Sequence, residues 1–273
     1  MSVLTSKHQK LHQIAPAFES IVGLHMLEAD LDTDQLGTFT GEIERKFPPL
    51  ETAIRKARMG MRHLGIPIGM ASEGSIGADL VVPFVTSDVE HLVLVDDERH
   101  LIISEVYRSF EITAVSTVTF PDEDLTEFLA RAKFPNHKLI VKPNSTAEIS
   151  SIKGISTFQE LRRAIAECSK HSQNGSVLIE SDLRAHSSPS RQRNIARVAR
   201  LLAAKVNRLC PVCSVPGWGR VRFEMGLQCS MCKGFVAEAI RQEVNGCVLC
   251  SYTELGKVVT ESADPATCPR CNP

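Results

Sequence analysis

The sequence of 273 residues has few aromatic side chains, no marked excess of either charge and no long apolar run. Aromatic residues make up 5% of the chain, with one Trp, which argues against a single-strand nucleic-acid binder built on base stacking. The formal net charge of −1 excludes a strong overall field toward nucleic acid or a membrane. Apolar runs fall short of the roughly 18 residues of a membrane-spanning helix, and Met1–His8 lacks a signal-peptide core. We therefore expect a cytoplasmic globular protein.

Cysteine is scarce up to Leu209, where Cys168 is the only one, and abundant beyond it. Cys168 shares a helical face with Leu161 and Ile165, which indicates a core thiol. The other eight cysteines form Cys-x-x-Cys pairs: Cys210/Cys213, Cys229/Cys232, Cys247/Cys250 and Cys268/Cys271. Thiols stay reduced in the cytosol, so such pairs indicate metal ligands rather than disulfides. Zn²⁺ prefers four ligands in a tetrahedron, and two pairs complete one set. The sequence predicts two structural Zn²⁺ ions.

Each Cys-x-x-Cys pair is called a knuckle below, and the sequence leaves open which two knuckles share one zinc ion. Adjacent pairs would give two sequential zinc ribbons, and alternating pairs would give a cross-braced module. We favour the sequential form because it closes shorter loops. Residues 209–273 are too polar and too short to fold on an apolar core alone, so the metal is expected to supply folding energy. Four copies of the motif argue against a redox role, for which one reactive pair is enough.

Residues 1–208 alternate strand-like apolar runs with amphipathic helical stretches, which predicts an α/β domain ahead of the zinc-ribbon module at 209–273. The runs 91–95 and 101–104 read as a hairpin. Strands at 138–142 and 176–180 bracket a helix that begins at Thr157, which predicts a βαβ unit. A helix over 190–208 has an apolar stripe and a basic face that is either solvated or in contact with phosphate.

Three segments of the first domain carry candidate site residues. Thr5–Lys10 is a polar turn at a helix start, where backbone N–H groups with Lys7 and Lys10 could cradle a polyphosphate. Acids in Asp30–Glu42 and Glu51 could hold Mg²⁺, which takes oxygen ligands, while Lys56 could pair with phosphate oxygens. Ala71–Gly77, with Glu73 and Ser75, follows an apolar run, and ligands of open α/β sheets bind at strand ends.

These segments resemble the inosine-triphosphate pyrophosphatase superfamily. Its members open with a Thr-Gly-Asn-x-x-Lys turn, which Thr5-Ser-Lys-His-Gln-Lys10 resembles, although Lys7 departs from the pattern. Glu51-Thr-Ala-Ile-Arg-Lys-Ala57 is similar to their Glu-Asn-Ala-x-x-Lys-Ala helix, with Thr52 in place of Asn, and Ser72-Glu-Gly-Ser75 to a strand-end Glu-Gly-Gly motif. Pro189-Ser-Arg191 loosely matches a Ser-His-Arg helix start that contacts the base. The resemblance implies a mixed sheet of that fold.

Over nearly its full length the chain is also similar to an uncharacterised bacterial family, a domain of unknown function with C-terminal cysteine knuckles. The marks of this resemblance are the Thr-Lys-His-like start, Gly37–Glu42, Ala71–Ser75, the Phe134-Pro-x-His137 segment and the stretch that ends in Arg-Ala-His186. This resemblance brings no known activity.

Glu180-Ser-Asp182-Leu-Arg184-Ala-His186 continues an apolar strand. If the strand persists, the four polar side chains point to one face, because strand side chains alternate. Such a face could bind Mg²⁺ and polarise a phosphate, or it could form a self-satisfied salt-bridge network.

Two functions follow as hypotheses. The first is a Mg²⁺-dependent nucleotide pyrophosphatase or related phosphohydrolase, in which a metal-bound water attacks phosphorus. Its catalytic residues would be Glu51, Glu73, Asp182 and His186, with Glu42 as an extra ligand. Its substrate-binding residues would be Thr5, Lys7, Lys10, Lys56, Ser75, Arg184 and Arg191. The second is a non-enzymatic adaptor that binds a nucleotide or nucleic acid through the zinc ribbons and the basic helix.

Overall fold

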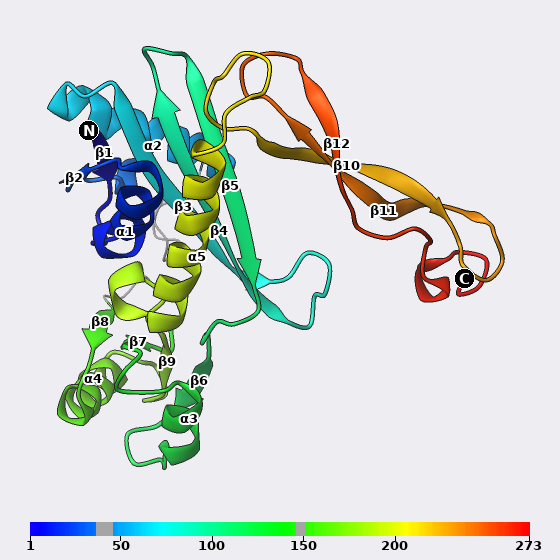
Figure 1. Cartoon of the computed structure of the whole chain (residues 1–273). Helices are drawn as coiled ribbons and strands as arrows, with labels where there is room; N and C mark the ends of the chain where they lie inside the picture. The colour runs from blue at the N-terminus through cyan, green and yellow to red at the C-terminus, as the bar shows by residue number, and fades with distance from the viewer. Residues whose placement is uncertain (37–45, 146–150) are drawn as a thin grey trace.

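The computed structural model describes residues 1–36, 46–145 and 151–273, and Figure 1 shows a body of two lobes with a long arm. The first lobe is built on a five-stranded sheet of order β2-β1-β3-β4-β5. Its elements are β1 (Ser2–Thr5), α1 (Leu11–Val22), β2 (Met26–Ala29), the short 3₁₀ turn η1 (Asp34–Leu36), α2 (Pro49–Leu64), β3 (Ile68–Ala78), β4 (Thr86–Asp96) and β5 (Leu101–Ser109). The strand β1 runs parallel to both β2 and β3. The predicted hairpin is confirmed, because β4 pairs antiparallel with β5.

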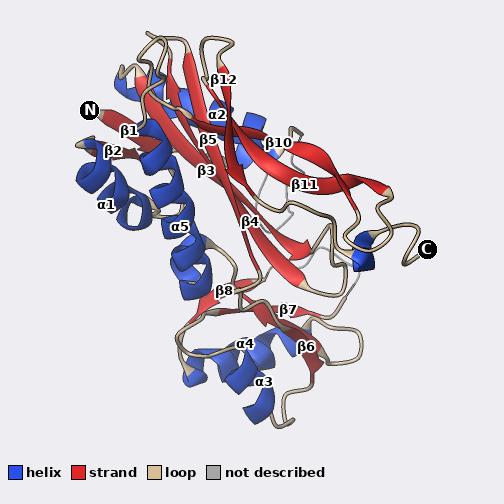
Figure 2. Ribbon diagram, turned by 45° about the vertical axis from the view of Figure 1, so that its right-hand side comes forward, coloured by secondary structure: helices blue, strands red, loops and turns tan. Residues whose placement is uncertain are grey.

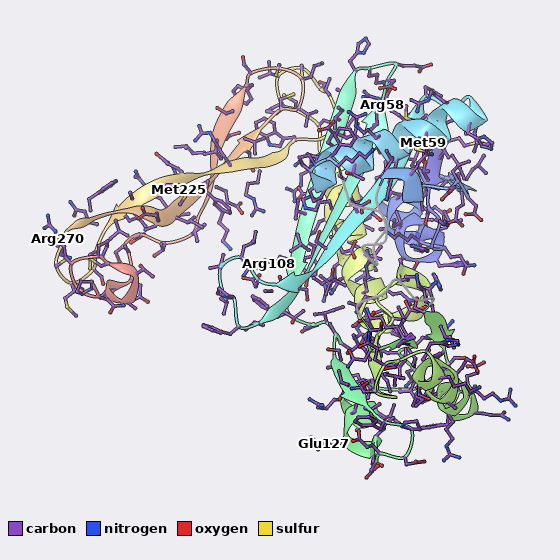
Figure 3. The ribbon with its side chains drawn as sticks, turned by 180° about the vertical axis from the view of Figure 1, so that it is seen from behind. Arg58, Met59, Arg108, Glu127, Met225 and Arg270 are labelled. Carbon is purple, nitrogen blue, oxygen red and sulfur yellow. The ribbon has the colours of Figure 1, made fainter. Side chains whose placement is uncertain are left out.

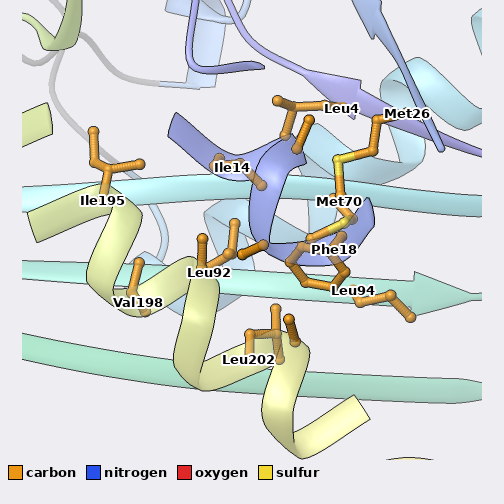
Figure 4. Close-up of a cluster of buried hydrophobic side chains, with 14 of the residues drawn as sticks. Leu4, Ile14, Phe18, Met26, Met70, Leu92, Leu94, Ile195, Val198 and Leu202 are labelled. Atoms are coloured by element: carbon orange, nitrogen blue, oxygen red, sulfur yellow. The ribbon is translucent and has the colours of Figure 1, made fainter. Parts of the chain in front are cut away.

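The two faces of this sheet are covered by different helices. On one face, α1 and α5 (Pro189–Val206) pack against the strands, and Phe18 meets Leu92 and Leu202 in the buried cluster of Figure 4. On the other face, α2 buries its stripe of small and apolar side chains, including Ala57 and Met61. Each large apolar side chain buried in this way contributes about 1.5–3 kcal/mol. The connection from β1 to β2 through α1 therefore crosses one face of the sheet, and the connection from β2 to β3 through α2 crosses the other face.

The second lobe holds a four-stranded antiparallel sheet of order β6-β9-β7-β8. Its elements are β6 (Ser116–Thr119), α3 (Thr126–Arg131), β7 (Leu139–Pro143), β8 (Ile152–Ile155), α4 (Phe158–Lys170) and β9 (Val177–Ser181). The predicted βαβ unit between 138–142 and 176–180 is wrong, because β7 and β9 are antiparallel. The strand β8 intervenes and is itself antiparallel to β7, so the crossover through α4 starts from β8. Cys168 is buried in the core of this lobe with Leu161 and Ile165, as predicted.

After β9 the chain makes a 3₁₀ turn, η2 (Ala185–Ser187), and α5 carries it back along the first lobe. The apolar stripe predicted for this helix consists of Ile195, Val198, Leu202, Val206 and Leu209. The first four are buried, as predicted, whereas Leu209 lies beyond the helix and is exposed. Within the part of the chain that the structure describes, no helix has the length and apolar character needed to cross a membrane.

The arm follows α5 and consists of an antiparallel sheet of order β10-β11-β12. Its elements are β10 (Gly219–Gln228), β11 (Phe235–Gly246), β12 (Thr253–Val258) and the short 3₁₀ turn η3 (Pro265–Thr267). Figures 1 and 2 show the arm leaving the first lobe and ending in a free tip that holds the C-terminus. Figure 3, from behind, places Met225 partway along the arm and Arg270 at its tip, far from Glu127 in the second lobe.

Candidate metal centres and a basic crevice

The eight cysteines of the arm form two compact groups. One group contains Cys210, Cys213, Cys247 and Cys250, and the other contains Cys229, Cys232, Cys268 and Cys271; within each group, all sulfur atoms lie within 4.8 Å of one another. The closest sulfurs across each group are 3.5–3.8 Å apart. A tetrahedral zinc ion with bonds of about 2.3 Å would place its sulfur ligands about 3.8 Å apart. Each group therefore fits one zinc ion, and the two can hold two.

The sequential pairing favoured from loop length is wrong. The first knuckle lies with the third and the second with the fourth. The reason is that the segments between knuckles are extended strands rather than closing loops. Ten residues of β10 separate the first two knuckles by about 33 Å, at roughly 3.3 Å per residue. The antiparallel return of β11 then brings the third knuckle back to the first, so the two groups sit at opposite ends of one sheet.

Local backbone geometry shapes the knuckles for thiolate ligands. Ser214 and Lys233 each follow the second cysteine of a pair and adopt φ of 58°, a left-handed conformation that closes the turn. Backbone N–H groups also point at sulfur: those of Leu249 and Cys250 donate to Cys247 Sγ over 3.3 and 3.4 Å. Such donors stabilise the negative charge of a metal-bound thiolate.

A second candidate site is a crevice at the carboxyl end of β1. It is lined by Thr5, Ser6, Lys7, His8, Lys10, Thr33, Lys56, Ser72, Glu73 and Arg191. The crevice lies between β1 and β3, where the helices that follow successive strands pass to opposite faces of the sheet. Ligands of open α/β sheets bind at such a switch point. Four of the segments singled out in the sequence meet here, although they are far apart along the chain.

The loop from Thr5 to Lys10 forms one wall. The Ser6 hydroxyl accepts hydrogen bonds from the backbone N–H groups of His8 and Lys10, both over 3.3 Å. Gln9 adopts φ of 52°, which tightens the turn. The loop leads directly into the N-terminus of α1, whose first N–H groups lack partners within the helix and favour anions.

Two lysines form the buried part of the crevice. Lys10 is 8% exposed, and its Nζ donates to the Ser72 hydroxyl over 2.8 Å. Lys56 is 9% exposed, and its Nζ lies 2.6 Å from a Glu73 carboxylate oxygen. The sequence prediction placed Lys10, Lys56 and Glu73 in one site, and the structure brings them together.

Arg191 closes the crevice from the start of α5 and is 1% exposed. Its Nε donates to Glu90 Oε1 over 2.6 Å, and its Nη1 donates to the Leu183 carbonyl over 2.8 Å. Gly74 makes room for this ion pair, because a Cβ there would lie 2.3 Å from Arg191 Nη2 and 2.6 Å from Glu90 Oε1. Glu90 was missed in the sequence, where the signal was an acid within the apolar run of β4.

Positive charge dominates the electrostatics of the crevice. Burial, and then the charges of Lys10, His186 and Arg191, lower the pKa of His8 to about 4. Burial and the charge of Arg191 lower the pKa of Lys10 to about 8. In both groups the surroundings disfavour the positively charged form, so an anion bound in the crevice would raise both pKa values again.

Other predicted residues lie at the rim or outside the crevice. Lys7 is at the mouth and pairs with Asp32 over 3.0 Å. Glu51 lies outside the lining, on the exposed first turn of α2, where it pairs with Arg55 over 2.6 Å. The whole Gly37–Glu42 motif, including Glu42, lies outside the described residues.

The segment after β9 differs from its prediction. The strand ends at Ser181 and the chain turns at η2, so Glu180, Asp182, Arg184 and His186 do not share a strand face. Asp182 instead pairs with Arg184 over 2.5 Å, and although burial opposes it, this partner lowers the pKa of Asp182. His186 nevertheless lies next to a lining residue of the crevice, with its ring centroid 5.3 Å from that of His8.

A larger cavity of about 570 Å³ lies between the lobes. Glu73 lines the basic crevice while Gly74 and Ser75 line this cavity, so the two hollows follow one another along β3. The second lobe contributes polar groups to the cavity, including Lys142 and Glu180, which pair over 3.1 Å. Its volume falls in the range of roughly 300–1,000 Å³ that small-molecule sites occupy.

In the described part of the chain, the two cysteine groups are the only places where three or more His, Cys, Asp or Glu side chains converge at ligand distance. The carboxylates proposed for Mg²⁺ do not form such a group, since Glu51 lies outside the crevice and Glu73 pairs with Lys56. Any Mg²⁺ at the crevice would depend on oxygen ligands supplied by the bound molecule.

The structure thus defines a mixed α/β protein with a basic crevice at a sheet switch point and a C-terminal arm with two Cys₄ groups that can hold metal ions. The chain belongs to the family described as Domain of unknown function (DUF6671), whose model matches residues 56–273. That match includes Lys56, Glu73, Arg191 and all the knuckles, and it begins after the Thr5–Lys10 loop. No curated protein and no solved structure matches the chain. The resemblance to the inosine-triphosphate pyrophosphatase superfamily therefore stays a prediction.

Proposed function

We propose that the crevice binds the phosphates of a nucleotide or a related phosphorylated small molecule, and that the protein hydrolyses a phosphoanhydride bond of this ligand. The observation that carries the proposal is the convergence of Lys10, Lys56 and Arg191 beside Glu73 at the switch point. Glu73 pairs with Lys56 and Glu90 pairs with Arg191, so the charge of Lys10 remains as an excess that a phosphate would offset. The organic part of the ligand would extend into the neighbouring cavity between the lobes.

The reaction that the resemblance implies is hydrolysis of a nucleoside triphosphate to the monophosphate and pyrophosphate. Water adds to the α-phosphorus, the bond from that phosphorus to the bridging oxygen breaks, and pyrophosphate leaves with the electron pair. Glu73 would accept the proton of the water, with Lys56 holding its carboxylate in place. The substrate would enter as its Mg²⁺ complex, in which the metal neutralises phosphate charge. Lys10 and Arg191 would bind the phosphate oxygens.

The test is pyrophosphate release from a panel of nucleoside triphosphates with Mg²⁺, using zinc-loaded protein. Glu73→Gln should lower turnover about 10²- to 10⁴-fold, the range of a general base. Lys10→Met should weaken binding of tripolyphosphate about 10- to 100-fold, because it removes a charged hydrogen-bond donor. Lys257→Ala, an exposed lysine on β12, is the matched control and should change neither quantity. Absence of both binding and hydrolysis across the panel would exclude this function.

A non-enzymatic nucleic-acid adaptor is the second candidate, and one observation favours it: Arg193, Arg197 and Arg200 form an exposed stripe on α5. The arm does not add to this surface. Residues 209–273 hold six Lys or Arg and six Asp or Glu, and each Zn²⁺ with four thiolates would add a net charge of −2. If nucleic acid binds, its affinity should fall steeply with salt, and Arg197→Ala should reduce the slope. A flat response to salt would remove this candidate.

A further inference from the structure

Two buried acids lie directly behind the crevice. Asp88 and Glu90 are both 0% exposed and stand two residues apart on β4, so their side chains share one face of the strand. Opposite them on β3 are Ile76 and Gly74, which leave the acids facing α5. There Asn194 donates from Nδ2 to Asp88 Oδ2 over 2.8 Å, and Arg191 pairs with Glu90.

The hydrogen bonds of Asp88 and Glu90 use only one oxygen of each carboxyl group. Among the described residues, Asp88 Oδ1 and Glu90 Oε2 are buried and have no hydrogen-bond partner. A buried acceptor without a partner costs about 1–3 kcal/mol, and more when it is charged. Two neighbouring carboxyl groups can satisfy both oxygens with one proton, as paired carboxylates do elsewhere. A metal ion fits poorly, because the Arg191 guanidinium is adjacent and no third carboxylate, His or Cys completes a ligand group there in the described residues.

We propose that Asp88 and Glu90 share one proton, and that this pair is the positioning element that holds Arg191 in the phosphate crevice. With the proton, one carboxylate balances one guanidinium, and the buried unit is neutral. Without it, two carboxylates face one guanidinium, and the extra negative charge weakens the attraction of the crevice for an anion. The inference rests on the proposed phosphate binding, which supplies the ligand that Arg191 would contact.

The surroundings place the loss of this proton near neutral pH. Burial, and then the charge of Glu90, raise the pKa of Asp88 to about 7, against the opposing effects of Asn194 and Arg191. From the loop before α1, the Lys10 ammonium acts on both Glu90 and Arg191. From β5, Ser109 and Tyr107 lie in register with Asp88 and Glu90, and β3 contributes no charge at these positions. A bound phosphate should raise the Asp88 pKa further, so binding should take up a proton.

The decisive variant is Asp88→Asn, which imitates the protonated acid. The Asn oxygen can accept from Asn194, and its amide nitrogen can donate to Glu90 Oε2. We would measure tripolyphosphate affinity by calorimetry at pH 6 and pH 8, each in two buffers of different ionisation enthalpy. From pH 6 to pH 8, the affinity of the wild-type protein should fall by a factor that is about three to ten times larger than the factor for the variant. One proton can change the affinity by at most about tenfold per pH unit, and the expected difference lies within that limit. The wild type should also take up more protons on binding. Equal pH profiles and equal proton uptake would overturn the proposal.

Two further measurements separate this inference from the proposed function. Infrared spectra without ligand should show a protonated carboxyl band that disappears between pH 6 and pH 9 in the wild type and is missing in Asp88→Asn. If tripolyphosphate binds neither protein, the proposed function fails, and the infrared band decides whether the shared proton exists. Glu90→Gln should weaken tripolyphosphate binding more than Asp88→Asn does, because it removes the partner of Arg191. If Glu90→Gln folds and binds as tightly as the wild type, Glu90 has no positioning role.

Discussion

Around α1 and α5 the interior is filled by apolar side chains such as Phe18, Leu92 and Leu202, whereas the arm has little interior to fill. The buried cluster of the arm contains five residues, and two of them are the candidate metal ligands Cys229 and Cys268. Backbone ordering costs about 1–2 kcal/mol per residue. In the first lobe, the burial of apolar side chains offsets this cost. In the arm, each structural zinc ion would contribute about 10–16 kcal/mol. With zinc bound, the first lobe and the arm would therefore be stabilised by different means.

Removal of zinc should produce the largest loss of structure, and this loss should be confined to the arm. We expect about two zinc ions per chain by elemental analysis of the purified protein. A strong chelator should abolish hydrogen-exchange protection in β10–β12, because the metal supplies most of the folding energy there. Protection in β3, β4 and α5 should remain. If the body loses protection together with the arm, the two regions are not held independently.

Paired serine substitutions test the alternating pairing of the knuckles. Cys229→Ser with Cys271→Ser removes two ligands of one group and should leave about one zinc ion per chain. The matched control, Cys213→Ser with Cys229→Ser, removes one ligand from each group and should weaken both sites. Under sequential pairing the two variants would exchange their zinc contents, so the measurement distinguishes the two forms.

A cavity made in the core of the body should destabilise the body by a smaller amount and leave the arm unchanged. Phe18→Ala removes a fully buried ring from the cluster between α1 and α5. It should lower the free energy of unfolding of the body by about 3–5 kcal/mol, measured by urea denaturation. Ile21→Ala, at an exposed position of the same helix, should change it by less than about 1 kcal/mol. An equal loss of bound zinc in Phe18→Ala would show that the core and the metal groups are coupled.

The same contrast explains how much the sequence could predict. Metal ligands and crevice residues belong to short local patterns, such as Cys-x-x-Cys and the Thr5–Lys10 turn, so both could be found without a structure. Lys56, Glu73 and Arg191 were predicted to share one site from their motifs, and only Arg191 lies at a helix start. The strand end expected at Glu73 is wrong, because β3 continues to Ala78, and Lys56 lies in the middle of α2. The alternating pairing could not be predicted, because it depends on β10 and β11 running the full length of the arm.

Long-range pairing was likewise out of reach. Glu90 and Arg191 are 101 residues apart and pair only because α5 returns to the first sheet after the second lobe. The expected strand through His186 is wrong for a local reason, since the backbone turns at η2 and Arg184 donates to Asp182 just before that turn. No periodicity in the sequence marks that turn.

The smallest expected effect lies in the second lobe, at the start of α4. The Thr157 hydroxyl accepts from the Glu160 N–H over 3.1 Å, and the Glu160 carboxylate accepts from the Thr157 N–H over 3.0 Å, which together form a capping box. Thr157→Ala should therefore lower the free energy of unfolding by about 1 kcal/mol, measured by urea denaturation. Thr157→Ser keeps the hydroxyl and should restore most of it. Zinc content should not change in either variant, because α4 packs on its own lobe through Leu161 and Ile165. A loss of zinc on Thr157→Ala would mean that the lobe and the arm fold as one cooperative unit, which is the outcome that the different means of stabilisation exclude.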